Sequence, residues 1–307
     1  MRTTHGLKTL ATLALMLAFP VTTFSADSPD LSGTYPLEGH YLLVDEGGKE
    51  SYTGSVTLKR QATVKLPIGE MDWYLVTWEY EKWTPNNGVA VLVGNVLCFA
   101  YAQSPRTEIS LVVPNPLTQS ERAAAAADYK DKLENAYATW DRVDDRSLYP
   151  GMKPTDNLLS FSFQSDDYVR IWTMSGPAGF EGEYEREGVS INKRGKRLNP
   201  GMTSREKFTL TASGPGWNID GRGSGTIVAS FDLAGAALRL NDSLWILGAT
   251  GPNWNPNAVG FYLIRDNKLN GEAYSRGDLS LYYETLAVPD KILKRAPTFF
   301  AGPTPGP

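Results

Sequence analysis

Three tryptophans lie in stretches whose composition predicts loops, and their side chains are well suited to hold a ligand. Trp83 precedes the sequence Thr-Pro-Asn-Asn-Gly, and Trp217 and Trp254 each lie in a Gly-Pro-x-Trp-Asn sequence. An indole ring in a loop presents an apolar face that can stack on a sugar ring or cover the end of a barrel. We therefore predict Trp83, Trp217 and Trp254 as ligand-binding residues; the alternative is that they fold back onto the core.

Four alternating acids are the strongest candidates for hydrolytic chemistry. Glu181, Glu183, Glu185 and Glu187 would line one face of a strand. Two neighbouring carboxyl groups can hydrolyse a glycosidic bond when one of them stays protonated. However, a row of acids on one strand is more typical of a solvated face. A carboxylate-dependent glycan hydrolase is therefore kept as an alternative, and no residue is predicted to be catalytic.

The other groups that carry out nucleophilic or metal chemistry are scarce. His5 lies within residues 1–26, which we expect to be removed as a signal, so His40 is the remaining imidazole. Cys98 is the single thiol. One histidine and one cysteine cannot build a transition-metal site. Two Ser-x-x-Lys sequences, at residues 190–193 and 204–207, lack the companion motifs of acyl-transfer enzymes. The sequence therefore predicts neither a metal nor a cofactor.

Residues 1–26 have the features of a secretory signal. Arg2 and Lys8 precede an uncharged apolar run, which Pro20 interrupts before a stretch of small residues that ends at Ala26. The strongly apolar part is about 11 residues long, whereas a bilayer span needs about 20. We predict cleavage after Ala26 and export to the periplasm or the medium, with an uncleaved N-terminal anchor as the alternative.

Charge and cysteine content narrow the class of partner. Cleavage would remove two of the 30 basic residues and none of the 34 acidic ones, so the mature charge is 28 − 34 = −6. An acidic chain does not favour nucleic acid as a partner.

A single cysteine excludes an intramolecular disulfide, and the apolar run from Val91 to Tyr101 predicts that Cys98 is an inert thiol in a buried strand.

Most of residues 31–286 reads as short β-strands separated by turns. Tyr41 to Leu58 predicts a hairpin, and the alternation from Leu159 to Phe163 predicts one buried face and one wet face that carries Ser160 and Ser162. The exception is a capping box at Thr118 and Glu121 followed by an alanine run, which predicts a helix over residues 119–142. The expected fold is all-β, with antiparallel barrel or sandwich units and one inserted helix.

Short internal matches suggest two related β units or two halves of one barrel. An apolar-x-Gly motif followed by Tyr occurs at residues 31–35, 180–184 and 269–274. We therefore expect four parts: a signal peptide at 1–26, a β unit with a helical insertion at 27–187, a second β unit at 188–288, and a Pro/Gly-rich tail at 289–307.

Several of these stretches resemble a repeat of bacterial exported proteins of unknown function. The similarity rests on Tyr52-Thr-Gly-Ser-Val56, on Trp78, on residues 88–97 and on residues 261–271. It implies a small β-barrel or sandwich in an exported protein, and it implies no activity.

The sequence as a whole favours a non-catalytic binding or accessory protein of the bacterial envelope, which holds a small apolar or sugar-like ligand. A soluble structural subunit docked on a membrane protein complex is the second interpretation, and the glycan hydrolase is the third. A deep aromatic-lined site would favour the first, and two close carboxyl groups with one raised pKa would favour the third.

Overall fold

The computed structural model describes 14 stretches of the chain. They are residues 29–42, 49–66, 69–102, 107–115, 117–124, 153–164, 168–192, 203–214, 216–225, 229–241, 244–250, 258–265, 268–276 and 281–289. The expected signal at 1–26 lies outside them. So do Trp254 and all of the expected tail except Pro289.

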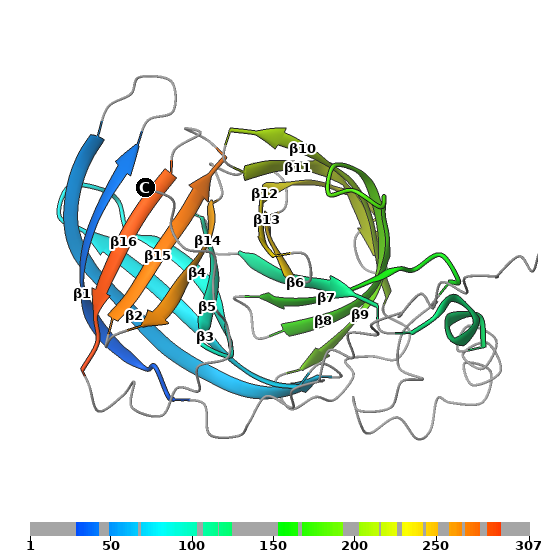
Figure 1. Ribbon diagram of the computed structural model, residues 1–307, viewed down its shortest axis with the longest axis horizontal. Coiled ribbons are helices and arrows are strands. Elements are labelled where there is room, and N and C mark those ends of the chain that lie inside the picture. Colours follow the sequence, from blue (N-terminus) through cyan, green and yellow to red (C-terminus); the bar gives the residue numbers. More distant parts are fainter. Residues whose placement is uncertain are drawn as a thin grey trace, which may run out of the picture.

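The chain forms two closed antiparallel barrels of eight strands each, which lie side by side (Figure 1). The all-β prediction is therefore confirmed. The first barrel contains β1 (Gly33–Leu42), β2 (Lys49–Leu66), β3 (Gly69–Tyr80), β4 (Asn86–Val93), β5 (Val96–Ala102), β14 (Ala258–Arg265), β15 (Lys268–Ser275) and β16 (Leu281–Ala287).

The second barrel is built from the middle of the chain. It contains β6 (Glu108–Pro114), β7 (Leu158–Gln164), β8 (Tyr168–Ser175), β9 (Gly182–Asn192), β10 (Thr203–Ser213), β11 (Gly216–Gly225), β12 (Phe231–Asn241) and β13 (Leu244–Thr250). In Figure 1 its green and yellow strands stand beside the blue, cyan and orange strands of the first barrel.

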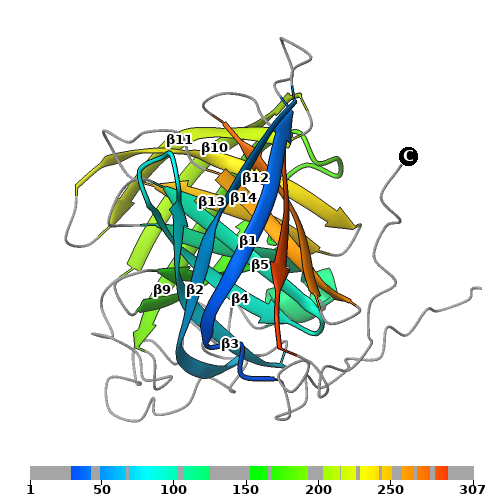
Figure 2. The ribbon, with the colours of Figure 1, turned by 90° about the vertical axis from the view of Figure 1, so that its left-hand side faces the viewer.

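The two barrels divide the chain differently from the expected units at 27–187 and 188–288. The first barrel closes where β1 pairs with β16 and β5 pairs with β14, so it unites the two ends of the chain. Figure 2 shows β1 crossing the face of this barrel, with the orange strands behind it. The expected boundary after residue 187 lies inside β9. Sequence reading placed neighbouring strands in one unit, whereas the chain leaves the first barrel and later returns to it.

Aromatic and β-branched side chains alternate along the strands and fill both barrel interiors. The predicted hairpin from Tyr41 to Leu58 is confirmed as the β1–β2 pair. The run from Val91 to Tyr101 folds as two strands, because Gly94 adopts a positive φ of 62° in a tight turn. Cys98 lies in β5 and is fully buried, as expected.

A third core lies between the barrels. It joins outward-facing residues of β3, β4 and β5, such as Trp73, Val91 and Cys98, to outward-facing residues of β6 and β7, such as Leu111 and Phe163. The rings of Trp73 and Phe163 lie 6.3 Å apart across this boundary. Strands of the contact region are therefore buried on both faces, which explains their nearly continuous apolar sequences.

The predicted helix begins as expected. The backbone N–H of Glu121 donates to Thr118 Oγ1 at 3.3 Å, and the backbone N–H of Thr118 donates to Glu121 Oε2 at 2.8 Å. This reciprocal pair is the capping box that the sequence indicates. Residues 119–124 are helical, and residues 125–142 of the expected helix lie outside the described part. Within the described residues, no helical segment has the length and apolarity of a membrane span.

Candidate functional site

Aromatic side chains gather at one end of the first barrel. We name this group the aromatic end; its members are Tyr41, Tyr52, Tyr80, Trp83 and Tyr282. The tyrosines come from the end of β1, the start of β2, the end of β3 and the start of β16, which antiparallel pairing brings to the same rim. The strands thus hold the tyrosines, while Trp83 lies in the exposed β3–β4 connection.

Trp83 packs against three tyrosines at once. Its ring centroid lies 5.1 Å from that of Tyr52, 5.4 Å from that of Tyr80 and 5.7 Å from that of Tyr41. Trp83 is nevertheless 40% exposed, and it is the one large hydrophobic side chain that is exposed among the described residues. The indole thus contacts the tyrosines in tilted and edge arrangements and keeps part of its surface exposed to solvent.

A buried carboxyl group lies beneath these rings. Glu284 of β16 accepts a hydrogen bond from Tyr52 Oη at 2.9 Å and another from Tyr262 Oη. Trp78 Nε1 donates to Tyr262 Oη at 3.1 Å and extends the network across the barrel. Burial raises the pKa of Glu284 above its ordinary value of 4.5, although the two tyrosines act in the opposite direction. The site therefore offers a carboxyl group and hydroxyl groups directly below an aromatic surface.

Trp217 lies in the other barrel, so the structure does not bring it together with Trp83. Its ring lies 4.4 Å from Phe180, which in turn lies 4.7 Å from Trp245. Trp217 Nε1 donates to Glu181 at 3.4 Å, and the buried Nε1 of Trp245 has no hydrogen-bond partner. Trp217 is partly buried against the barrel, which is the fold-back arrangement that the sequence left open.

The interior of the second barrel holds a buried ion network. Arg186 binds Glu206 at 2.6 Å and Glu108 at 3.0 Å, and its side chain is 1% exposed. Its guanidinium lies 4.2 Å from the ring centroid of Trp172. Burial raises the pKa of Glu206. Burial would also raise the pKa of Glu108, but Arg186 and Arg170 lower it below its ordinary range.

This network corrects one expectation from the sequence. Ser160 and Ser162 do not lie on a wet face, because they point into the second barrel and are fully buried. Arg186 Nη1 lies 3.3 Å from Ser160 Oγ and 3.5 Å from Ser162 Oγ. Their alternation with apolar residues is real, but both faces of β7 are covered.

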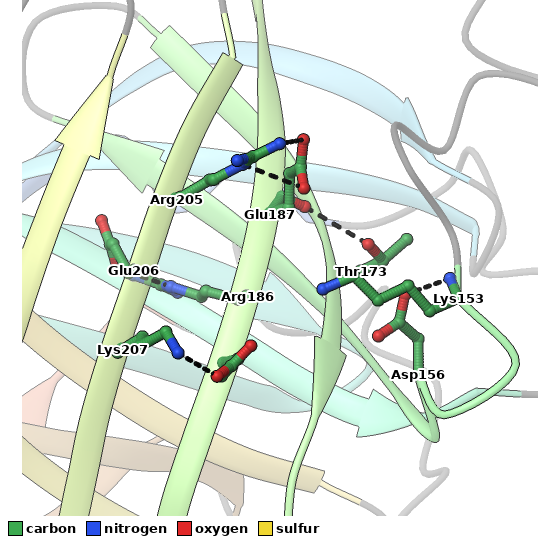
Figure 3. A pocket seen from close by; sticks show the side chains of 9 residues that line it. Lys153, Asp156, Thr173, Arg186, Glu187, Arg205, Glu206 and Lys207 are labelled. Carbon is green, nitrogen blue, oxygen red and sulfur yellow. Dashed lines mark hydrogen bonds and ion pairs between the residues drawn. The ribbon is translucent and has the colours of Figure 1, made fainter. Parts of the chain in front are cut away.

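The alternating acids lie beside a charged cleft of about 320 Å³ on the outside of the second barrel. In Figure 3, Glu187 pairs with Arg205, and Lys207 pairs with the carboxyl group of Glu185. Glu181, Glu183 and Glu185 are exposed, as a solvated face requires. Glu185 and Glu187 are therefore held in ion pairs. Asp156 also lines the cleft; burial raises its pKa, and the backbone N–H of Lys153 donates to its carboxyl group at 2.6 Å.

The remaining reactive groups are dispersed. His40 stacks on Tyr283 with centroids 5.1 Å apart, far from the buried thiol of Cys98 in the core between the barrels. The Ser-x-x-Lys sequence at 204–207 lies on β10, where Lys207 pairs with Glu185. In the described part of the chain, no three histidine, cysteine, aspartate or glutamate side chains gather into a metal-binding cluster.

Sequence reasoning singled out Trp83 as a candidate and did not single out the residues beneath it. Tyr52 and Glu284 are separated by 232 residues in the chain, so no local motif could join them. The sequence feature that could have indicated this cluster is the number of tyrosines near the ends of expected strands: Tyr41, Tyr52, Tyr80 and Tyr282.

Comparison with known proteins adds no relative, because no family model, curated protein or solved structure matches this chain.

Proposed function

We propose that this chain is a non-catalytic, exported binding protein that takes a small apolar or sugar-like ligand at the aromatic end of its first barrel. The observation that carries the proposal is the environment of Trp83. Its partly exposed indole packs against tyrosine rings, and Tyr52 beneath it donates to a buried carboxyl group. Export rests on the composition of residues 1–26 alone.

The chemistry of this end suits recognition better than catalysis. Aromatic faces supply stacking surface, and tyrosine hydroxyls and a carboxyl group supply directional hydrogen bonds. Glu284 is a buried carboxyl group that accepts hydrogen bonds from the phenols of Tyr52 and Tyr262. Another acid at this end, Glu50, is exposed and accepts a hydrogen bond from Tyr41 Oη at 2.6 Å.

The position of Trp83 provides a way in for the ligand. Residues 81–85 are all exposed and belong to no strand, and the backbone N–H of Glu81 anchors this connection by donating to Thr53 O at 3.3 Å. A short outward movement of the connection would let a ligand enter between the indole and the tyrosine rings. Trp83 would then form one wall of the site.

The buried pair of Glu108 and Glu206 does not favour the hydrolase alternative. One of the two has a raised pKa, as that alternative requires. However, both carboxyl groups bind the same guanidinium, and their side chains are 10% and 2% exposed. Arg186 therefore pairs with both acids of this candidate site.

A calorimetric screen of glycans, lipids and small metabolites against the mature chain tests the proposal. We expect a hit whose affinity falls about tenfold or more in Trp83→Ala, since a stacking wall is lost. Trp217→Ala is the matched control, and it should bind as the unmodified protein does. Binding that depends on Trp217 and not on Trp83 would move the site to the second barrel and contradict the proposal.

A further inference from the structure

Three tyrosines surround the place that the Trp83 indole now occupies. The rings of Tyr41, Tyr52 and Tyr80 lie between 5.1 and 5.7 Å from its centre. A cation is attracted to an aromatic face when it lies within about 6 Å of the ring centroid. A positive group of similar size in this place would therefore lie within that distance of several aromatic rings at once, with the displaced indole as one more wall.

The acidic group beneath the rings takes the matching sign when it ionises. Glu284 is 6% exposed, and among the described residues no lysine or arginine forms an ion pair with it. By contrast, the buried acids of the second barrel share Arg186. Beside Tyr80, the buried Oδ1 of Asn86 is an acceptor without a partner in the described part of the chain. The aromatic end thus collects acceptors and a carboxyl group, and the neighbouring Lys82 lies in the exposed β3–β4 connection.

We propose that the ligand of the aromatic end is an organic cation, such as a quaternary or tertiary ammonium group. This inference rests on the proposed function, because it names the ligand class of the same site. The cation lies between Trp83 and the tyrosines. Its positive charge favours the ionised form of Glu284, which then supplies the opposite charge through the layer of Tyr52.

Choline and its neutral carbon isostere 3,3-dimethylbutan-1-ol test the inference, because the two have the same shape and differ in charge. Titration calorimetry on the mature chain should give an affinity for choline about tenfold or more above that for the isostere. Glu284→Gln keeps the shape and acceptor of the side chain, and it should reduce this preference. Tyr283→Phe, on the outer face beside His40, is the matched control and should leave it unchanged.

The outcomes separate the inference from the proposed function. Equal binding of the two probes, or a preference that Glu284→Gln leaves intact, overturns the cation inference. Absence of choline binding together with a neutral hit that depends on Trp83 also overturns it, and the proposed function then stands. Absence of every ligand in both experiments overturns both.

A second inference comes from the strand order. β1 to β5 close with β14, β15 and β16, and β9 to β13 close with β6, β7 and β8. If β6 to β8 took the place of β14 to β16, β1 to β8 would form a simple up-and-down barrel, and β9 to β16 would form another. The order is that of two consecutive eight-strand units.

The first strands of the two units match residue by residue. Residues 31–39 and 180–188 share an apolar residue, Gly, Tyr, Glu and Gly at the same spacing, with a constant shift of 149 residues from Leu31 to Phe180. Gly33 and Gly182 both have positive φ, at 154° and 130°.

The contacts of these residues match as well. Tyr35 Oη donates to the carbonyl of Leu31 at 2.8 Å, and Tyr184 Oη donates to the carbonyl of Phe180 at 2.6 Å. The partners across the ladder also agree. Glu38 of β1 lies opposite Thr285 of β16, and Glu187 of β9 lies opposite Thr173 of β8.

We infer that the chain consists of two tandem copies of one eight-strand unit. The last three strands of each copy pair within the barrel of the other copy. The third sequence match, at residues 269–274, does not belong to this set. It lies in β15, and its Tyr274 Oη donates to Asn218 of the second barrel.

Paired cysteines in the full chain test the exchange. Residues directly opposite in a ladder are close enough for a disulfide. Glu38→Cys with Thr285→Cys should oxidise to an intrachain disulfide, whereas Glu38→Cys with Thr173→Cys should stay reduced. Thr173 would be the partner of Glu38 if each unit closed on itself. A disulfide in the Glu38 and Thr173 pair overturns the inference, as does a folded Glu38 and Thr285 variant that fails to oxidise.

Discussion

At the scale of single residues, the two barrels treat buried charge in opposite ways. The second barrel neutralises Glu108 and Glu206 with the guanidinium of Arg186 and surrounds it with serine hydroxyls. In the first barrel, Glu284 has hydrogen bonds from tyrosines and no described cation. Ionised groups without an opposite charge are costly to bury. Substitution of Arg186 should therefore lower stability outright, whereas substitution of Glu284 should change how stability depends on pH.

Arg186→Met should destabilise the protein strongly. The substitution leaves Glu206 without its cation and leaves Glu108 with Arg170 at 3.6 Å, and loss of one partner from a buried ion pair typically costs about 3–5 kcal/mol. Denaturant unfolding measures the change. Arg205→Met is the matched control: Arg205 is 71% exposed where it pairs with Glu187, so we expect a change below about 1 kcal/mol. Equal effects of the two variants would contradict the role of the buried network.

Glu284→Gln should change how stability depends on pH. Burial raises the folded-state pKa of Glu284 above 4.5, so the folded state keeps a proton that the unfolded chain releases. Its stabilising contribution is complete below pH 4.5 and is lost as the pH rises through the folded-state pKa. Melting temperatures across pH 4 to 8 should therefore show the variant gaining stability relative to the unmodified protein as the pH rises. A constant difference would show that the pKa of Glu284 is not raised.

At the scale of elements, the sequence predicted strands well and their surroundings less well. Alternation along Leu159 to Phe163 predicted the strand correctly. When that strand is considered alone, however, Ser160 and Ser162 are expected to face solvent. Their environment depends on Arg186, which comes from another strand and lies 24 to 26 residues away. Periodicity reports that two faces differ, and it does not report what covers each of them.

Packing between the two barrels is close at β13, where a side chain on Gly248 would enter the contact between barrels. A Cβ there would lie 3.0 Å from Cβ of Ala100 in β5 and 3.4 Å from Cβ of Val259 in β14. Gly248→Val should therefore destabilise the protein by about 1–3 kcal/mol through overpacking. Gly225→Ala is the control, because its Cβ would meet only ordinary contacts from 3.4 Å outward. Equal thermal unfolding of both variants would show that the contact between barrels adapts freely.

At the scale of the whole molecule, the fold class could be predicted and the closure of the barrels could not. Strand-rich composition and turn spacing pointed to barrels or sandwiches. The pairing of β1 with β16 joins residues more than 200 positions apart, and no local pattern encodes it. The aromatic end depends on this same closure, since Tyr282 and Glu284 come from β16. The sequence therefore indicated Trp83 and could not indicate its partners.

The shared core predicts that the barrels unfold together. Phe163 of the second barrel is fully buried against the first, where its ring meets Trp73. Phe163→Ala should cost about 3–5 kcal/mol and lower one common transition. Differential scanning calorimetry tests this: we expect a single peak in both proteins, with the peak of the variant at lower temperature. Two peaks, with only one shifted, would show that the barrels are independent folding units.

The most direct test of the account follows Trp83 itself. With 5-fluorotryptophan incorporated throughout, the Trp83 and Trp217 resonances can be assigned from Trp83→Phe and Trp217→Phe variants by fluorine NMR. On addition of a ligand from the screen, the account predicts that the Trp83 resonance shifts in a saturable way, while the Trp217 resonance stays in place. A bound ligand that shifts Trp217 and leaves Trp83 unchanged would contradict the claim that the aromatic end of the first barrel is the binding site.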